Sequence, residues 1–215
     1  MLTDAVRRAY GERAGEYTEV LGSLSAMAEE DQDLISGWAR DIDGPTIDAG
    51  CGPGHWTKFL HDHGVAAEGI DMVSEFIDHA TARFPEVPFR VATLQALPAD
   101  DGALAAILSW YSLIHTPPHD VPAVLSEFAR CIEPDGSLLL GFFEGEQITA
   151  FDHAVVTAYF WPVPLMRDEL TAAGFEIVET HTRADLGKRP HAAIITRRRR
   201  SLSLRGFDYP RRHSG

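Results

Sequence analysis

Apolar positions change their spacing along the chain, and the changes predict an alternation of helices and strands. In segments 3–22 and 24–40 apolar side chains recur at helical intervals, which indicates two amphipathic helices. Farther along, short apolar runs alternate with helical patterns. The expected strands cover 46–48, 66–72, 89–93, 104–111, 137–143, 175–180 and 192–196, and helices are expected to begin near residues 55, 74, 120 and 164.

Local signals refine this pattern. Ser74 and Asp120 are placed to cap the helices that follow them, and Pro164 suits the first turn of the last helix. Residues 133–136 (Glu-Pro-Asp-Gly) predict a turn before the fifth strand. The stretch 144–162 is aromatic and reads as irregular.

Strands that alternate with helices through short loops favour parallel βαβ units, and therefore a single Rossmann-like, doubly wound α/β domain over residues 41–196. The runs 104–111 and 137–143 are apolar throughout, as expected of strands covered on both faces. Residues 1–40 are predicted to form an N-terminal helical cap, and residues 197–215 a basic, flexible tail. In such a sheet the ligand lies beyond the carboxyl ends of the strands, normally beside the first strand.

Composition narrows the class of protein. The chain has 215 residues, of which 45% are hydrophobic, enough for one domain with a sizeable core. No apolar run approaches the roughly 20 residues that span a bilayer, and the first residues lack a secretory signal. The two cysteines, Cys51 and Cys131, suit a reducing compartment. We expect a cytoplasmic monomer or homodimer without membrane association.

Charge is distributed unevenly. The net charge is −13, from 19 basic and 32 acidic residues. Seven arginines and one aspartate follow residue 196, so the tail carries +6 and the first 196 residues carry −19. An acidic body repels a phosphate backbone, so nucleic acid is not the expected partner. Residues 197–200 resemble a basic interaction arm, but a solvated end that aids solubility is the favoured interpretation.

A glycine-rich turn after the first strand is the centre of the predicted site. Gly50, Gly52 and Gly54 alternate with other residues, and an expected helix follows them. Glycine lets a backbone turn sharply or approach a ligand closely, and the helix beyond presents free N–H groups. A dinucleotide fingerprint needs its third glycine where His55 stands, and no Walker Gly-Lys-Ser/Thr motif exists. The spacing therefore disfavours a nicotinamide dehydrogenase and a P-loop protein.

Two carboxylates sharpen the identity of the ligand. Asp71 ends the second strand, 21 residues after Gly50, where a carboxylate can accept hydrogen bonds from both hydroxyls of a ribose. Asp48 ends the first strand, and a carboxylate in the ligand crevice disfavours phosphate but suits a cation. A ribose, a positive charge and no pyrophosphate together describe S-adenosylmethionine.

At this point the sequence resembles class I S-adenosylmethionine-dependent methyltransferases, in particular the small-molecule type 11 group. The resemblance covers roughly residues 9–196 and is carried by Ile47–Gly54, Gly69–Met72, Ala96–Pro98, Leu139–Leu140 and the aromatic pattern of Tyr10–Tyr17. It implies methyl transfer to an oxygen, nitrogen or carbon of a small-molecule acceptor. It also implies a seven-stranded, mostly parallel sheet whose last strand is antiparallel.

The resemblance further implies roles in cofactor binding. Asp48 and the glycine turn hold the methionine part, Asp71 binds the ribose, and Met72 lies against the adenine. The family's acidic residue at the adenine amine is replaced by Thr93, so this contact falls to the Thr93 hydroxyl or to the Leu94 backbone. Whether the N-terminal tyrosines cover the cofactor or only pack is open. The expected cofactor-binding residues are Tyr10, Tyr17, Asp48, Gly50, Gly52, Gly54, His55, Asp71, Met72, Thr93, Leu94 and Trp110.

The acceptor is expected across the crevice, beside the segment that leaves the fourth strand. His115 is the candidate base for an acceptor hydroxyl or amine, because its ordinary pKa is near neutral; capping a loop or helix is the alternative. Tyr111 is expected to orient the acceptor or to pack. The stretch 144–162 is interpreted as a substrate lid, or else as a cover of the core. Three aromatic residues are expected to contact the substrate. They are Phe143, at the end of the preceding strand, and Tyr159 and Trp161, within this stretch.

No metal site is expected, because the histidines lack metal-ligand spacing with cysteines or carboxylates. Two other functions stay open. One is a non-catalytic protein that binds S-adenosylmethionine or another nucleoside. The other is an RNA methyltransferase that uses the Arg-rich tail as an electrostatic arm.

Overall fold

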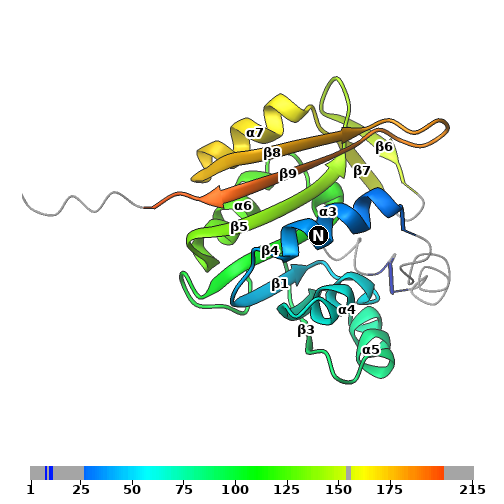
Figure 1. The fold of residues 1–215 in the computed structure, drawn as a ribbon. Coiled ribbons are helices and arrows are strands. Elements are labelled where there is room, and N and C mark those ends of the chain that lie inside the picture. Colours follow the sequence, from blue (N-terminus) through cyan, green and yellow to red (C-terminus); the bar gives the residue numbers. More distant parts are fainter. Residues whose placement is uncertain (1–7, 9, 12–26, 154–155, 201–215) are drawn as a thin grey trace, which may run out of the picture.

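The computed structural model describes residues 8, 10–11, 27–153 and 156–200, and its central element is a seven-stranded sheet of order β3-β2-β1-β4-β5-β9-β8 (Figure 1). β9 runs antiparallel to both neighbours, and the other pairs are parallel. The predicted sheet with an antiparallel last strand is confirmed. Its strands are β1 (Pro45–Ala49), β2 (Ala66–Asp71), β3 (Phe89–Val91), β4 (Leu104–Trp110), β5 (Ile132–Phe143), β8 (Phe175–Arg183) and β9 (His191–Arg198).

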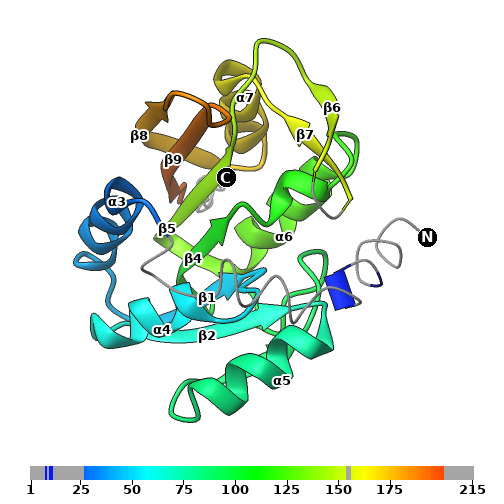
Figure 2. The ribbon, with the colours of Figure 1, turned by 90° about the vertical axis from the view of Figure 1, so that its right-hand side faces the viewer.

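The winding of the sheet reverses at β1. The chain passes from β1 outward to β2 and β3, and then returns to the other side of β1 with β4 and β5. The register pairs Asp48 of β1 with Gly69 of β2 and with Leu108 of β4. Because these strands are parallel, their carboxyl ends meet at one edge of the sheet, the edge that faces the viewer in Figure 2.

Helices cover both faces of the sheet (Figure 2). Trp38 of α3 and Trp56 of α4 share a core cluster with Leu108 of β4, whereas Phe128 of α6 shares the opposite cluster with Ile107. β4 is thus buried on both faces, as its apolar run predicts. No helix within the described ranges is long and apolar enough to cross a membrane. The helices are α3 (Glu29–Ala39), α4 (His55–Asp62), α5 (Ser74–Arg83), α6 (Val121–Cys131), α7 (Val163–Ala172) and the 3₁₀ turn η2 (Leu113–His115).

The stretch 144–162 is more regular than its sequence suggests. It contains an antiparallel hairpin of β6 (Thr149–Asp152) and β7 (Thr157–Phe160). The rings of Phe151 and Phe160 stack across this hairpin, with centroids 4.2 Å apart. The prediction of an irregular segment is therefore wrong, because cross-strand aromatic pairs stabilise a hairpin that the short, broken pattern hid.

Two predicted caps and one predicted turn also need correction. Ser74 is the first residue of α5 rather than its cap, and Asp120 makes no side-chain capping hydrogen bond. Strand β5 already begins at Ile132, and the predicted turn at 133–136 is an irregular part of that strand. Within it Asp135 adopts φ 70°, and the pairing with β4 shifts between Leu104 and Ala106. The predicted turn is therefore present as a local bend, but it lies within β5 rather than before it.

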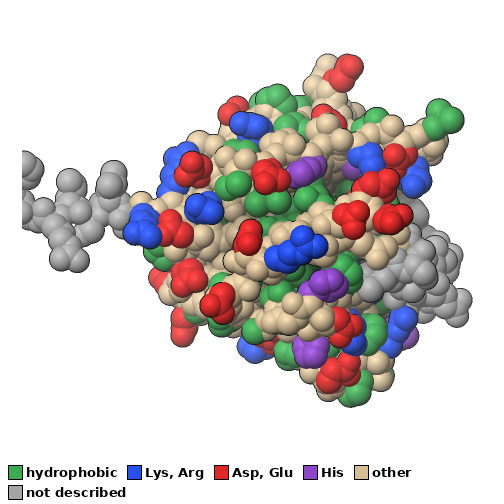
Figure 3. Space-filling view, viewed as in Figure 1, with side chains coloured by type: hydrophobic (Ala, Val, Ile, Leu, Met, Phe, Trp, Pro, Cys, Tyr) green, Lys and Arg blue, Asp and Glu red, His purple; other side chains and the backbone are tan. Residues whose placement is uncertain are grey.

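The basic end of the chain is held to the domain in its first four residues. Arg197 and Arg198 belong to β9, and the Arg198 guanidinium donates to the carbonyls of Ala129 and Gly174 at 2.8 and 3.0 Å. Arg200 Nε donates to the Asp135 carboxylate at 2.6 Å. Figure 3 shows Lys and Arg side chains at this end with acidic side chains beside them, and both kinds recur over the rest of the face. The tail boundary at 197 is therefore too early, and residues 201–215 lie outside the described ranges.

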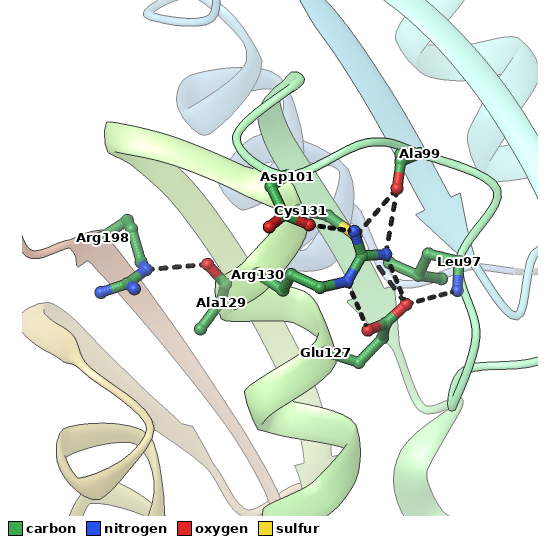
Figure 4. Close-up of polar contacts among 8 residues, drawn as sticks. All are labelled: Leu97, Ala99, Asp101, Glu127, Ala129, Arg130, Cys131 and Arg198. Atoms are coloured by element: carbon green, nitrogen blue, oxygen red, sulfur yellow. Dashed lines mark hydrogen bonds and ion pairs between the residues drawn. The ribbon is translucent and has the colours of Figure 1, made fainter.

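A cluster of ion pairs holds the loop between β3 and β4 against α6 (Figure 4). Glu127 accepts the Leu97 N–H at 2.8 Å and pairs with Arg130 at 2.8 Å. Arg130 also donates to the Ala99 carbonyl at 3.0 Å and to Asp101 at 2.7 Å. A bidentate guanidinium that satisfies several partners gives a defined geometry. These contacts fix the loop that follows β3 against α6.

Phe128 tests the core on the α6 face. Phe128→Ala should lower the free energy of unfolding by about 3–5 kcal/mol, because the ring is fully buried and its removal leaves a cavity. Urea denaturation followed by circular dichroism measures the change. Val178→Ala, at an exposed position of β8, is the control and should change the free energy by less than about 0.5 kcal/mol. A similar small effect at both positions would contradict this packing.

Candidate functional site

A cavity of about 480 Å³ opens at the carboxyl edge of the sheet. One wall, which we call the glycine wall, consists of the turns that follow β1, β2 and β3. The opposite wall, which we call the aromatic wall, consists of the end of β4 and the segment after it, the adjoining ends of β5 and β9, Tyr10 near the N-terminus and His153 after β6. The glycine wall includes Asp48, Gly50, Gly52, His55, Asp71, Met72 and Leu94, and the aromatic wall includes Tyr10, Trp110, Tyr111, His115, Phe143, His153 and His191.

The glycine turn combines close packing with open space. The N–H groups of Gly50 and Cys51 both donate to the Ile70 carbonyl at 2.8 Å, which ties the turn to β2. Gly50 has φ 80°, and a Cβ there would lie 2.3 Å from the Cβ of Ser112. Gly52 has φ 52°, but a Cβ there would have no neighbour within 4 Å. Gly50 therefore lets two loops meet, whereas Gly52 leaves room for a ligand.

Asp48 forms the floor of the glycine wall and is only 2% exposed. The Thr57 hydroxyl, on α4, donates to its carboxylate at 2.7 Å. Burial raises the pKa of Asp48 to about 7; the Thr57 hydrogen bond opposes the rise, and repulsion by Asp71 adds to it. A cation bound in the cavity favours the ionised carboxylate, so its binding is coupled to pH near neutrality.

Asp71 joins the glycine turn to the start of α5. One carboxylate oxygen accepts the Gly52 N–H at 2.9 Å, and the other accepts the Val73 N–H at 2.9 Å. Burial raises the pKa of Asp71, and the backbone hydrogen bonds oppose that rise. Each carboxylate oxygen has a second lone pair. Asp71 can therefore hold the turn and still accept hydrogen bonds from a ligand's hydroxyls.

The wall beside Asp71 is mostly apolar and includes one side-chain amide. Met72, Leu94 and Gln95 line the cavity there, and the Ala92 N–H donates to the Asp71 carbonyl at 3.0 Å. Gln95 was not predicted, because nothing in its local pattern distinguishes it from a surface residue. Thr93 forms a bridge with Ala96 and does not line the cavity. Its hydroxyl is therefore not brought to the site.

His115 connects three parts of the aromatic wall. Its Nδ1 lies 2.8 Å from the Thr157 carbonyl, and its Nε2 lies 2.7 Å from the Tyr10 hydroxyl. A carbonyl only accepts, so Nδ1 carries the proton and Nε2 of the neutral ring accepts from Tyr10. Burial lowers the pKa of His115, and the bond to Thr157 partly opposes this. His115 is thus a neutral imidazole with both nitrogens already engaged.

Tyr111 is the strained residue of the site. It follows β4 directly, has φ 55°, and lines the cavity. A left-handed conformation in a non-glycine residue costs about 1–3 kcal/mol and is concentrated at functional sites. The turn directs its hydroxyl to Nδ1 of His191, and its ring lies 5.0 Å from that of Phe143. Burial raises the pKa of Tyr111, so the hydroxyl stays protonated.

Charged side chains close the cavity beside Tyr111. Arg183 on β8 donates to Asp31 on α3 at 2.8 Å and lies 3.0 Å from Asp185. Arg183, Asp31 and Lys188 all line the cavity. None of them was predicted, because only the tertiary structure brings β8, the β8–β9 loop and α3 together.

The rest of the aromatic wall is built around Phe143. Its ring lies 5.7 Å from that of Phe151 and 6.3 Å from that of His153. The Arg189 guanidinium stacks on both phenylalanines, 5.8 and 4.8 Å from their centroids. His153 lies 5.2 Å from His115, and burial lowers its pKa to about 4, with repulsion by His115 and Arg189 adding to the shift. This wall is therefore aromatic and largely uncharged.

The structure separates the predicted residues into two groups. Tyr10, Asp48, Gly50, Gly52, His55, Asp71, Met72, Leu94, Trp110, Tyr111, His115 and Phe143 all line the cavity. Gly54, Thr93, Tyr159 and Trp161 do not; Trp161 is 3% exposed and Tyr159 packs against the same core cluster. Both aromatic side chains therefore pack in or against the core. This agrees with the alternative interpretation, in which the stretch 144–162 covers the core. Tyr17 lies outside the described residues.

His55 on the glycine wall is a largely buried, neutral group. Burial lowers its pKa to about 4, and Arg83 adds repulsion. Its Nδ1 is buried without a hydrogen-bond partner among the described residues. No group of three or more His, Cys, Asp or Glu in the described ranges could hold a metal ion.

Comparison with known proteins agrees with this geometry. Residues 47–136 match a family model described as a methyltransferase domain. Malonyl-[acyl-carrier protein] O-methyltransferase of Erwinia billingiae (strain Eb661) is 26% identical over 144 residues, which are 67% of this chain and 55% of that protein. The chain spans about half the length of the curated relatives it matches.

Solved structures share the fold at lower sequence identity. Burkholderia thailandensis 1,6-didemethyltoxoflavin-N1-methyltransferase superposes with a TM-score of 0.75 at 18% identity, over 92% of this chain and 88% of that one. The [4+2]-cyclase SpnF superposes with a TM-score of 0.77 at 17% identity, over 90% and 95%. A shared fold does not by itself imply a shared reaction.

The family match begins in β1 and continues to the start of β5, so it includes the glycine turn, Asp71 and the segment after β4. The strand order and the antiparallel β9 agree with the architecture that the sequence predicted. The narrower type 11 assignment stays a prediction. The sequence match to a methyltransferase domain covers residues 47–136, and the solved structures extend the likeness in fold to about nine tenths of the chain.

Proposed function

We propose that this protein transfers the methyl group of S-adenosylmethionine to an oxygen, nitrogen or carbon atom of a small molecule. One observation carries the proposal: Asp48, the glycine turn and Asp71 all line one cavity at the reversal point of the sheet. That cavity also has an aromatic wall suited to a second, organic ligand.

The residues present fit this cofactor. The open side of Gly52 admits a ligand against the backbone, and Asp71 has lone pairs for the ribose hydroxyls. The apolar surface of Met72 and Leu94 beside Asp71 suits the adenine ring. The buried carboxylate of Asp48 favours a ligand of net positive charge. When bound, the sulfonium supplies an activated methyl group with a good leaving group.

The chain's own task is mainly alignment. With a good leaving group, orientation of the acceptor against the methyl carbon supplies most of the required rate enhancement. The aromatic wall of Tyr111 and Phe143 can hold a flat or apolar acceptor, and Arg183 and Lys188 can meet a polar end. Some curated relatives are named for a malonyl group on acyl-carrier protein, and one structural neighbour for a small nitrogen heterocycle. A small acceptor, free or carried, is the class we propose here.

A direct experiment tests this function. The protein is incubated with methyl-labelled S-adenosylmethionine and a metabolite panel that includes malonyl-acyl-carrier protein, and products are identified by mass spectrometry. Calorimetry with S-adenosylhomocysteine runs in parallel. Binding together with labelled product supports the proposal. Binding without any product would favour a non-catalytic S-adenosylmethionine-binding protein, and methylation of RNA alone would favour an RNA methyltransferase.

The ribose assignment predicts the effect of Asp71→Asn. The variant keeps the size of the side chain but lacks the negative charge, so S-adenosylhomocysteine should bind about 1–3 kcal/mol more weakly, the range of hydrogen bonds to charged groups. Isothermal titration calorimetry measures the change. Asp78→Asn, on the exposed side of α5, removes the same charge outside the cavity and should leave the affinity unchanged. Equal affinities for Asp71→Asn and the wild type would sink the assignment.

Asp48 predicts a pH dependence of cofactor binding. Its carboxyl is raised to a pKa of about 7, and a ligand of net positive charge prefers the ionised form. Affinity for S-adenosylmethionine should therefore rise as pH increases from 6 to 8, and Asp48→Asn should lose this rise. Thr57→Val should move the dependence to higher pH, because the lost hydrogen bond had stabilised the carboxylate. Thr182→Val, exposed on β8, is the control, and a wild-type affinity that falls over this range would contradict the prediction.

A further inference from the structure

Two tyrosine–histidine pairs line the acceptor side of the cavity. In one, the Tyr10 hydroxyl meets Nε2 of His115 at 2.7 Å. In the other, the Tyr111 hydroxyl meets Nδ1 of His191. All four residues line the cavity. Either pair has the groups to take a proton from an acceptor, so their surroundings must distinguish them.

The Tyr10–His115 pair is poorly placed to hold a proton. Nδ1 of His115 is committed to the Thr157 carbonyl, so a proton received at Nε2 can leave only from Nε2, back toward Tyr10, and cannot be passed on from the second nitrogen. No carboxylate among the described residues contributes to the pKa of His115, which burial lowers. The nearby ring of His153 is itself repelled by charge on His115. Among the described residues an imidazolium here has no counter-ion, and a partly buried charge without one is costly.

The surroundings of His191 are different. His191 begins β9 and pairs with Phe143 of β5, which places it across the sheet end from Tyr111. Only its Nδ1 has a hydrogen-bond partner among the described residues, so Nε2 is free to pass a proton on. Burial lowers the pKa of His191, and Arg183 and Lys188 act in the same direction. Asp31 and Asp185 oppose them, so carboxylates are at hand to offset a positive charge.

The Tyr111 hydroxyl cannot take a proton from the acceptor by itself. Its hydroxyl stays protonated because burial disfavours the phenolate, and the charge of Asp31 adds to this. It can accept a proton only while it gives up its own. The partner that receives that proton is the ring nitrogen to which the hydroxyl already points, and the left-handed backbone at Tyr111 holds this direction. The pair therefore works as a unit or not at all.

We infer that Tyr111 and His191 form a proton relay that deprotonates the methyl acceptor, in place of His115. This rests on the proposed function. As the acceptor's O–H or N–H nucleophile forms its bond to the methyl carbon, the carbon–sulfur bond breaks and its electron pair stays on sulfur. The acceptor's proton passes to the Tyr111 oxygen, and the Tyr111 hydroxyl proton passes to Nδ1 of His191. Asp31 and Asp185 oppose the repulsion that Arg183 and Lys188 exert on the resulting imidazolium, which releases its proton from Nε2 to water.

One test needs neither cofactor nor acceptor. Histidine-labelled protein is titrated by NMR, and the midpoint of His191 is compared between the wild type and Tyr111→Phe. A hydroxyl that donates to Nδ1 stabilises the neutral ring, so its loss should raise the midpoint. His181→Gln, on the exposed part of β8, is the control and should leave the His191 midpoint unchanged. An unchanged His191 midpoint in Tyr111→Phe would show that the Tyr111 hydroxyl does not donate to Nδ1, and this would overturn the relay.

The second test uses the acceptor found with labelled cofactor. His191→Gln should lower kcat by about 100-fold or more, the usual share of general-base catalysis, while the dissociation constant of S-adenosylhomocysteine stays within about twofold. With S-adenosylmethionine saturating at every pH, so that the titration of Asp48 does not enter, the wild-type kcat/KM for the acceptor should fall as pH drops below the ordinary pKa of histidine, because burial lowers the pKa of His191. This acidic limb should vanish in His191→Gln and persist in His115→Gln. His181→Gln should behave as the wild type.

The outcomes are distinct. Loss of turnover and of the acidic limb in His191→Gln, with cofactor binding intact, supports the relay. Wild-type turnover in that variant overturns it, whether another base acts or the acceptor has no proton to lose. If Tyr111→Phe does not fold, His191→Gln alone decides. If the wild type binds cofactor but methylates nothing, the proposed function fails and the relay fails with it.

Discussion

The carboxylate of Asp71 is the interaction on which the site depends most. One oxygen holds the N–H of Gly52 in the turn after β1, and the other holds the N–H of Val73 at the start of α5. Two strand ends are thereby locked together by charge-assisted hydrogen bonds in a buried place, where such bonds are strong. The open side of Gly52 and the lone pairs of Asp71 face one cavity because this lock sets the path of the turn.

Burial determines the protonation states around this lock. Asp48 and Asp71 are raised in pKa, whereas His55, His115, His153 and His191 are lowered. Without ligand, each shift favours the neutral form of the group. A ligand of net positive charge reverses the balance at the carboxylates, because it is the counter-ion that the glycine wall lacks. The histidines remain neutral and can accept protons. The cavity thus has two carboxylates on the glycine wall, which favour a cation, and opposite them an aromatic wall with the charged side chains of Arg183, Lys188 and Asp31 beside Tyr111.

The acceptor side is assembled from elements far apart in the chain. Asp31 on α3 pairs with Arg183 on β8, and Tyr111 after β4 bonds His191 on β9. The hairpin of β6 and β7 reaches the same wall through the Thr157 carbonyl, which fixes His115. Variation in these parts can change the acceptor without disturbing the glycine wall, as expected when a reaction is set by a site rather than by a fold.

The sequence by itself determined the sheet and most of the residues that form the glycine wall of the cavity. Those features depend on local signals: apolar runs of strand length, glycines where the backbone has positive φ, and acids at strand ends. The tertiary structure alone decided the rest. Trp161 is part of the core and Thr93 does not line the cavity, whereas Gln95, Arg183 and His191 do. Such residues carry no local mark, because their roles arise from pairing between distant strands. His115 shows the same limit: its type suggested a base, but hydrogen bonds from two distant segments engage both of its nitrogens.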